Sequence, residues 1–303
     1  METVGALMAA LAGPSGVRRS DPVREDGSER APAVSPEDAL PPEGGVGIEI
    51  ADAVATITIA TARGALDTRA KTALRDGLER IASDVRVRAV VLTGVGRTFC
   101  VGQDLVEHST ALADDATAAW DTLREHYNPI VTSLATMPKP VIAAVNGVAA
   151  GAGASFAFAC DLRLIADDAA FHLAFAAVGL SPDSGLSWTL PRLIGHGRAA
   201  ELLLRPRQRP IPASDAVLLG LVHAVVPAAD LHARARELAL ELAAGPTVAY
   251  GAAKQAMAYS AGHGLVDALD MEAGLQTLAG TTEDHAGAVA AFLEKRPPTF
   301  RGR

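Results

Sequence analysis

The sequence has few cysteines and no excess of positive charge. Its 303 residues include only Cys100 and Cys160, too few for a disulfide framework, so a reducing, cytoplasmic compartment is expected. Lys and Arg number 27 against 35 Asp and Glu, for a formal net charge of −8, which argues against a nucleic-acid partner. The eight histidines form no His-x-x-x-His pair and lie near no cysteine spacing, so no metal site is expected.

The sequence also lacks a run suited to crossing a membrane. Pro140–Cys160 carries no charge, but it contains Asn146-Gly147, Gly151 and Gly153 and is dominated by Ala rather than Leu. That composition favours a strand, a turn and a small-residue helix over a membrane span. The apolar stretch Val4–Ala12 is short and has no positive flank, so we expect neither a secretion signal nor a membrane partner.

Three regions differ in composition along the chain. Residues 1–45 hold six prolines, mixed charges and no aromatic residue, which predicts a disordered arm. Order is expected from Val46, where alternating apolar residues up to Ile59 indicate two paired strands. We predict a core over residues 46–245 and a helical region over residues 246–303.

Short apolar runs and helical patterns alternate within this core. Arg88–Thr93, Val141–Val145 and Leu162–Ala166 are typical of buried parallel strands. Asp67 can cap a helix whose apolar positions follow at helical spacing up to Ile81. Repeated strand–helix order predicts an α/β fold with crossover connections. Four helices are expected to end the chain: Leu231–Ala244, Thr247–Ser260, Leu265–Ala279 and Glu283–Lys295.

Two glycine-bearing turns follow apolar strands, at Phe99–Leu105 and Asn146–Gly153. The second begins like a dinucleotide fingerprint or a nucleophile elbow, but Phe156 and Ala157 stand where the last glycine of each motif is required. Two such turns can aim two backbone N–H groups at one point, and a helix N-terminus there would favour a developing enolate oxygen. From spacing alone, glycines that serve only close packing explain the pattern equally well.

Several of these segments together resemble the enoyl-CoA hydratase/isomerase (crotonase) family. The resemblance lies in residues 88–94, 99–105 and 139–147 and in the ending 291–303, and it extends from about residue 46 to the C-terminus. It implies a spiral of ββα units and a C-terminal helical region that packs homotrimers or dimers of trimers. It also implies an acyl-CoA thioester as the substrate, with no separate cofactor.

The resemblance assigns roles to both turns. Val101 and Ala152 would supply the two oxyanion-binding N–H groups. Ala62, Gly64, Ala65 and Leu66 would follow the CoA nucleotide, although Gly64 replaces the asparagine usual in the family. The remaining positions expected to contact substrate are Gly102, Gln103, Asp104, Leu105, Gly151, Ser155 and Phe175.

The acid–base residues distinguish the reactions of the family. Its hydratases use two glutamates, and Ser155 and Phe175 occupy the matching positions here, which disfavours ordinary hydration. Asp183, in the turn Pro182–Gly185, resembles the proton-transferring aspartate of dienoyl-CoA isomerases and of phenylacetate-pathway ring isomerases. It also resembles the nucleophilic aspartate of chlorobenzoyl-CoA dehalogenases.

We therefore expect a double-bond isomerase with Asp183 as its single base. Two alternatives remain: a hydratase or hydrolytic enzyme in which Asp183 activates water or attacks carbon, and a non-catalytic acyl-CoA-binding protein. An aspartate that merely caps a turn is a further interpretation. Phe175 and Trp188 are expected to desolvate Asp183 and raise its pKa, Cys100 to serve packing, and His126 to lie on the surface.

Overall fold

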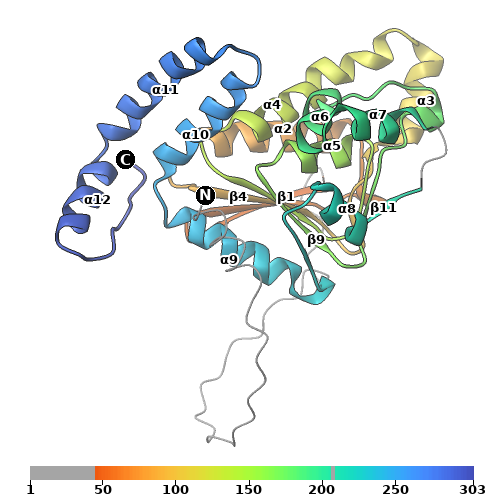
Figure 1. Cartoon of the computed structure of the whole chain (residues 1–303). Helices are drawn as coiled ribbons and strands as arrows, with labels where there is room; N and C mark the ends of the chain where they lie inside the picture. Colours follow the sequence, from red (N-terminus) through yellow and green to blue (C-terminus); the bar gives the residue numbers. More distant parts are fainter. Residues whose placement is uncertain (1–44, 206–208) are drawn as a thin grey trace, which may run out of the picture. The chain divides into compact units, whose positions relative to one another are not determined.

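The computed structural model describes residues 45–205 and 209–303 (Figure 1). The predicted arm, residues 1–45, lies outside the described residues apart from Gly45. The strands are β1 Val46–Ala51, β2 Val54–Ile59, β3 Ala65–Leu66, β4 Ala89–Gly94, β5 Thr98–Cys100, β6 Gly102–Gln103, β7 Val141–Val145, β8 Val148–Ala150, β9 Leu162–Ala166, β10 Ala170–His172, β11 Ile211–Pro212 and β12 Ala224–Val226.

Helices connect and cover these strands. The α-helices are α2 Thr68–Ser83, α3 Leu105–Asp114, α4 Asn128–Thr136, α5 Ala152–Ala159, α6 Leu186–Ile194, α7 His196–Leu204, α8 Ala213–Leu219, α9 Leu231–Ala243, α10 Thr247–Ser260, α11 Leu265–Gly280 and α12 Glu283–Leu293. The shorter turns are η2 Ala62–Gly64, η3 Ala118–Trp120, the π-helical η4 Leu123–Tyr127, η5 Ala176–Val178 and η6 Ala228–Asp230.

A six-stranded sheet has the order β1-β2-β4-β7-β9-β12. Only β1 and β2 pair antiparallel, and every other neighbouring pair is parallel. The strands β4 and β7 are buried along their whole length, as expected of parallel strands at the centre of a sheet, and α9 packs on both of them. The predicted apolar strands are thereby confirmed.

A second sheet, β11-β10-β8-β5, has four strands, and β3 pairs with β6 in a small third sheet. The strands β4, β7 and β9 belong to the first sheet, while the strands that follow them, β5, β8 and β10, belong to the second. Each of these three passes of the chain adds one strand to each of the two larger sheets before a helical segment. The fold is a spiral of ββα units, as the family resemblance implied.

Helix α2 begins where its cap was predicted. The Asp67 side chain accepts a hydrogen bond of 2.8 Å from the Ala70 N–H, which satisfies one of the unpaired amides at the helix start. Leu74 and Leu78 lie on the buried face. Burying such a side chain contributes about 2 kcal/mol, so this apolar stripe holds the helix against the core.

The C-terminal region is helical, as predicted. Helix α9 lies on the six-stranded sheet, whereas α10, α11 and α12 form a separate group of helices (Figure 1). No helix within the described ranges is long and apolar enough to cross a membrane. Large apolar side chains of this group are exposed, at Met257, Leu265, Val266, Leu269, Leu278, Val289, Phe292 and Leu293.

Candidate active site

The two glycine-bearing turns meet in the folded chain. Gly102 has a φ of +81°, and a Cβ placed on it would lie 3.1 Å from the amide nitrogen of Ala152. A Cβ on Gly153 would lie 2.0 Å from the backbone oxygen of Cys100. Only glycine permits these close approaches. Close packing therefore does explain the glycines, and it also brings the two turns to one point.

Ala152 lies at the start of a buried helix. It is the first residue of α5, whose cap Gly151 has a φ of 52° and accepts the Ser155 N–H. The first amides of a helix have no partner within it, and they carry the positive end of the helix dipole. The Ala152 N–H is thus suited to bind a developing oxyanion.

The first turn differs from the expectation in one hydrogen bond. The Val101 N–H donates to the Gly64 backbone oxygen at 2.9 Å, which contradicts the prediction that it is free for an oxyanion. The Asp104 N–H donates to the Leu66 oxygen at 3.0 Å. The left-handed φ of Gly102, +81°, interrupts the strand after Val101, so the alternation of amides is counted from Asp104. Because neighbouring amides of a strand point to opposite sides and the Asp104 N–H faces β3, the Gln103 N–H is directed away from β3. Gln103, rather than Val101, is the candidate donor.

The predicted CoA-binding loop supports this turn directly. Ala62–Gly64 form η2, in which Gly64 has a φ of +71° and a Cβ on it would lie 2.4 Å from Thr98 Cγ2. Ala65 and Leu66 pair with Gly102 and Gln103 as parallel strands. The structure thus joins the loop to the oxyanion turn, while contact with a nucleotide stays a prediction.

The remaining residues of the first turn lie at the start of α3. Asp104 caps this helix, and its Oδ1 accepts the Val106 and Glu107 N–H groups, both at 2.9 Å. Leu105 is 72% exposed. Neither side chain reaches the junction of the two turns in these contacts, so their predicted role in substrate binding stays a prediction.

The two positions that match the family's glutamates carry no acid or base. Ser155 is fully buried, and its Oγ donates to the Gly151 oxygen at 3.2 Å. The same Oγ lies 3.5 Å from the backbone oxygen of Asp183. Phe175 is 7% exposed, and its Cζ would lie 3.9 Å from a Cβ on Gly151. Both therefore surround the start of α5 as packing groups.

Asp183 lies in a tight turn before α6. Its backbone oxygen accepts the Leu186 N–H at 3.0 Å, and Ser184, with a φ of 50°, donates its hydroxyl to Asp183 Oδ1 at 2.8 Å. Burial raises the pKa of the Asp183 carboxyl above its usual value, and the Ser184 hydrogen bond opposes this in part. A carboxylate poised in this way can take up and return a proton.

A cavity of ≈590 Å³ opens beside Asp183. Asp121, Arg124 and Asn128 line it together with Ser181, and all come from η4, its flanks or the Asp183 turn. Trp188 is 44% exposed and carries the Arg192 guanidinium 4.1 Å from its ring centroid. The expectation that Trp188 desolvates Asp183 is therefore not supported by its contacts.

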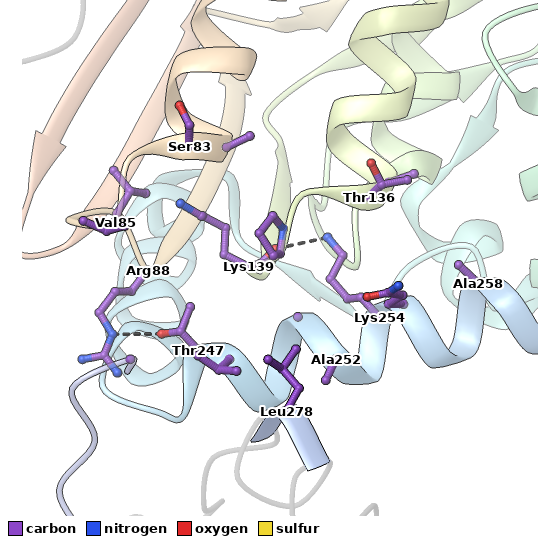
Figure 2. Close-up of a pocket in the computed structure, with 18 residues that line it drawn as sticks. Ser83, Val85, Arg88, Thr136, Lys139, Thr247, Ala252, Lys254, Ala258 and Leu278 are labelled. Carbon is purple, nitrogen blue, oxygen red and sulfur yellow. Dashed lines mark hydrogen bonds between the residues drawn. The ribbon is translucent and has the colours of Figure 1, made fainter. Parts of the chain in front are cut away.

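A second cavity, of ≈630 Å³, lies between α10 and the ends of α2 and α4 (Figure 2). Lys254 donates to the Lys139 backbone oxygen at 3.1 Å, and Arg88 donates to Thr247 Oγ1 at 2.9 Å (Figure 2). Its lining, within the described residues, includes no carboxylate, histidine or cysteine. We therefore place the candidate chemistry in the Asp183 cavity.

Both cysteines are buried and free. Burial raises the pKa of the Cys100 thiol to about 12, so it stays protonated at neutral pH and is no nucleophile. No group of three or more His, Cys, Asp or Glu side chains in residues 45–205 and 209–303 is arranged to hold a metal ion.

Sequence reasoning missed a buried polar cluster beside Gln103. Lys71 is 1% exposed and lies on the apolar face of α2, three and seven residues before Leu74 and Leu78. A lysine in an apolar stripe is the signal that would have indicated it. His126 is 8% exposed, so its expected surface position is wrong. Burial lowers the His126 pKa, and the charges of Lys71 and Arg75 add to this effect.

Comparisons with known proteins agree on one family. The family model for enoyl-CoA hydratase/isomerase matches residues 49–303. The chain is 41% identical to 1,2-epoxyphenylacetyl-CoA isomerase of Escherichia coli over 76% of this chain and 87% of that protein. It is 36% identical to 4-chlorobenzoyl coenzyme A dehalogenase-2 of an Arthrobacter species, over 69% of this chain and 76% of that protein. The crystal structure of an enoyl-CoA hydratase from Bacillus anthracis matches with a TM-score of 0.78 and 33% identity, covering 86% of this chain and all of that one.

Proposed function

Because this chain belongs to the enoyl-CoA hydratase/isomerase family, we propose that it moves a carbon–carbon double bond within an unsaturated acyl-CoA thioester. The observation that carries this proposal is the desolvated carboxyl of Asp183, combined with Ser155 and Phe175 at the two glutamate positions of the hydratases. Moving a double bond needs one group that removes and returns a proton, whereas hydration needs a positioned water.

The thioester oxygen binds where the two turns meet. The Ala152 N–H and the Gln103 N–H donate to it as negative charge develops, and the positive end of α5 adds to their field. Backbone donors on a packed strand and helix are already oriented before the reaction. Losing one such donor costs about 3 kcal/mol of transition-state stabilisation.

Asp183 transfers the proton. In a 3-enoyl thioester its carboxylate removes a proton from C2, and the C–H electron pair forms a dienolate whose negative charge lies on the thioester oxygen. Asp183, whose proton can exchange with solvent while the dienolate is bound, then delivers a proton to C4, and the double bond shifts to C2–C3. The raised pKa of Asp183 makes this carboxyl a better proton acceptor than an ordinary aspartate. No electron transfer occurs, so the reaction as proposed uses no redox cofactor.

The decisive experiment follows hydrogen exchange. The purified protein is incubated with a 3-enoyl-CoA and a 2-enoyl-CoA in deuterated water, and deuterium entry and product identity are read by NMR and mass spectrometry. We expect double-bond migration with exchange that is lost in Asp183→Asn. Asp121→Asn is the matched control, because Asp121 lines the same cavity but is exposed. Turnover unchanged by Asp183→Asn would refute the assignment.

A second candidate function is addition of water or displacement at carbon. It is favoured by the similarity to the dehalogenase and by the second carboxylate, Asp121, in the cavity. Incubation in ¹⁸O-labelled water separates the two functions, because isomerisation leaves no solvent oxygen in the product. Binding of CoA esters without any hydrogen exchange would instead indicate a non-catalytic member.

We also propose that the helices α10–α12 assemble the chain into trimers or dimers of trimers. Phe292 and Leu293 are 81% and 75% exposed on α12, and Leu265 and Val266 are 75% and 72% exposed on α11. Contiguous exposed apolar side chains of this size indicate a surface that another copy covers.

A further inference from the structure

A lysine is buried beside the candidate oxyanion site. Lys71 Nζ donates to Gln103 Oε1 at 3.2 Å, to Glu107 Oε1 at 3.0 Å and to Thr122 Oγ1 at 3.0 Å. These three bonds use all three N–H groups of the ammonium. An unpaired ammonium with 1% exposure would be strongly unfavourable, so the position of Lys71 depends on these partners.

The cluster holds the side chain of Gln103 in one orientation. Its Oε1 accepts from Lys71 Nζ and, at 2.8 Å, from the Tyr127 hydroxyl, so both lone pairs are used. Its Nε2 donates to Glu107 Oε1 at 3.3 Å. Turning the amide over would set its N–H groups against the two donors, so the network fixes the rotamer and the amide plane.

Tyr127 remains a donor at any ordinary pH. Burial raises its phenol pKa far above the usual value, and the neighbouring negative charges of Asp183 and Glu107 act in the same direction. The ring is 2% exposed and lies 6.0 Å from the Phe156 ring of α5, centroid to centroid. Tyr127 therefore connects Gln103 to the helix that begins at Ala152.

Glu107 anchors the cluster to the start of α2. Its Oε2 accepts the Thr68 N–H at 2.7 Å, and its Oε1 accepts the Thr68 hydroxyl at 3.0 Å. Partial burial raises the Glu107 pKa, but the bonds from Thr68 and Lys71 outweigh this and lower it overall. Glu107 thus stays charged opposite Lys71, and the cluster joins α2, β6, α3 and η4.

A cluster of this kind is a costly way to gain stability. Apolar side chains of similar volume often stabilise a core as well as a buried ion pair does, so the pair is better explained by the geometry that it imposes. The residue that it holds from three sides is Gln103, whose backbone N–H is directed away from β3. A displacement of about 1 Å at such a donor can cost ~10²-fold in rate.

We propose that Lys71 and Tyr127 are positioning residues, which act through the Gln103 side chain to keep its backbone N–H aimed at the thioester oxygen. This inference rests on the proposed function in one respect, the use of the Gln103 amide as an oxyanion donor. Lys71 and Tyr127 do not touch the substrate in this assignment; they fix the donor that does.

The test reads the polarisation of a bound thioester directly. The probe is a para-dimethylamino-cinnamoyl-CoA, whose absorption moves to longer wavelength when its thioester oxygen accepts hydrogen bonds. Lys71→Met and Tyr127→Phe are compared with the wild type, and Arg80→Met, an exposed cation on the same helix, is the control. We expect a shift in the wild type and the control, and loss of most of it in both variants.

Kinetics and a double variant complete the test. We expect kcat to fall about 10- to 100-fold in both variants while KM changes less than about threefold, since orientation rather than binding is impaired. Gln103→Leu keeps the backbone N–H but removes the side chain, so Lys71→Met should have little further effect in that background. Additive losses would overturn the inference.

The two proposals fail in distinguishable ways. A wild-type protein that binds the probe without a shift would overturn the oxyanion assignment itself. A wild-type shift that persists in Lys71→Met and Tyr127→Phe would overturn only the positioning role. Should Lys71→Met not fold, Tyr127→Phe still decides, because it removes one hydroxyl and leaves the ring packing unchanged.

Discussion

Gly102 lies against the amide of Ala152, so that a Cβ on residue 102 would lie 3.1 Å from the Ala152 nitrogen and 3.4 Å from its Cβ. These residues come from turns fifty positions apart, and their contact is the point at which the candidate oxyanion site forms. Glycine is required at residue 102 for two reasons: its φ of +81°, and the lack of space beside Ala152.

Gly102→Ala is expected to lower kcat by ~10²–10³-fold, because its methyl group crowds the site of the bound oxygen and displaces a donor. Isomerisation of a 3-enoyl-CoA measures this. Gly96→Ala is the matched control: Gly96 also has a positive φ, of +58°, but a Cβ there meets nothing within 4 Å. Both variants should lose about 1 kcal/mol of stability from the left-handed backbone, so equal activity losses would contradict the prediction.

The raised pKa of Asp183 predicts opposite pH dependences for activity and stability. Well below the ordinary aspartate pKa of 3.8 the carboxyl is protonated in both folded and unfolded chains. As pH rises, the unfolded chain loses this proton first, so stability falls until the raised folded pKa is passed. Asp183→Asn should therefore unfold at a higher temperature than the wild type at pH 7, and this gain should vanish in acid. Thermal unfolding at several pH values measures it.

The activity, unlike the stability, should increase as pH rises. Because the proposed base must be ionised, kcat/KM of the wild type should rise with pH through the raised pKa of Asp183 and then level off. Asp121→Asn should show the same profile. A profile that moves with Asp121→Asn would assign the base to Asp121.

The strand and helix pattern was predictable because its signals are local. Asp67 precedes an apolar helical stripe and caps α2, and Val141–Val145 is an apolar run bounded by Pro140 and Asn146 that forms β7. The four C-terminal helices follow from their composition and period in the same way. These features depend on residues close together in the chain.

The site was predictable only in part, because the type of a residue does not determine the direction in which its backbone N–H points. Ala152 follows from helix geometry, whereas the Val101 N–H is paired with the backbone oxygen of Gly64 in η2, a contact that no local pattern shows. Burial of Lys71 and His126 depends likewise on η4 packing over α2, far apart in the sequence. Long-range contacts decide these positions.

Phe292→Glu is expected to reduce the assembly to smaller species, because a charge in an apolar contact between copies is left unpaired. Leu218→Glu is the matched control, since Leu218 on α8 is also 81% exposed but lies outside the C-terminal helices. Light scattering coupled to size-exclusion chromatography gives the molar mass of each. A Phe292→Glu protein with the same molar mass as the wild type would contradict the proposed interface.

The ion pair between Lys254 and Asp161 joins α10 to the core, so removing it should lower the free energy of unfolding. Lys254 Nζ lies 2.7 Å from Asp161 Oδ2, which also accepts the Val141 N–H at 2.8 Å. Burial raises the Asp161 pKa, although Lys254 opposes this, so removing Lys254 leaves a desolvated carboxylate without its ion-pair partner. Lys254→Met should lower the free energy of unfolding by about 3 kcal/mol, and denaturant titration measures it.

Two further variants distinguish the loss of this buried ion pair from the loss of any charged side chain. Arg234→Ala removes an exposed pair with Glu237, whose side chains are 38% and 68% exposed, and should cost less than about 1 kcal/mol. Adding Asp161→Asn to Lys254→Met should restore part of the loss, because no buried charge then remains. The deficit of Lys254→Met should also shrink as pH falls and Asp161 becomes protonated. A deficit independent of pH would mean that Lys254 acts through its packing and its bonds to backbone oxygens alone.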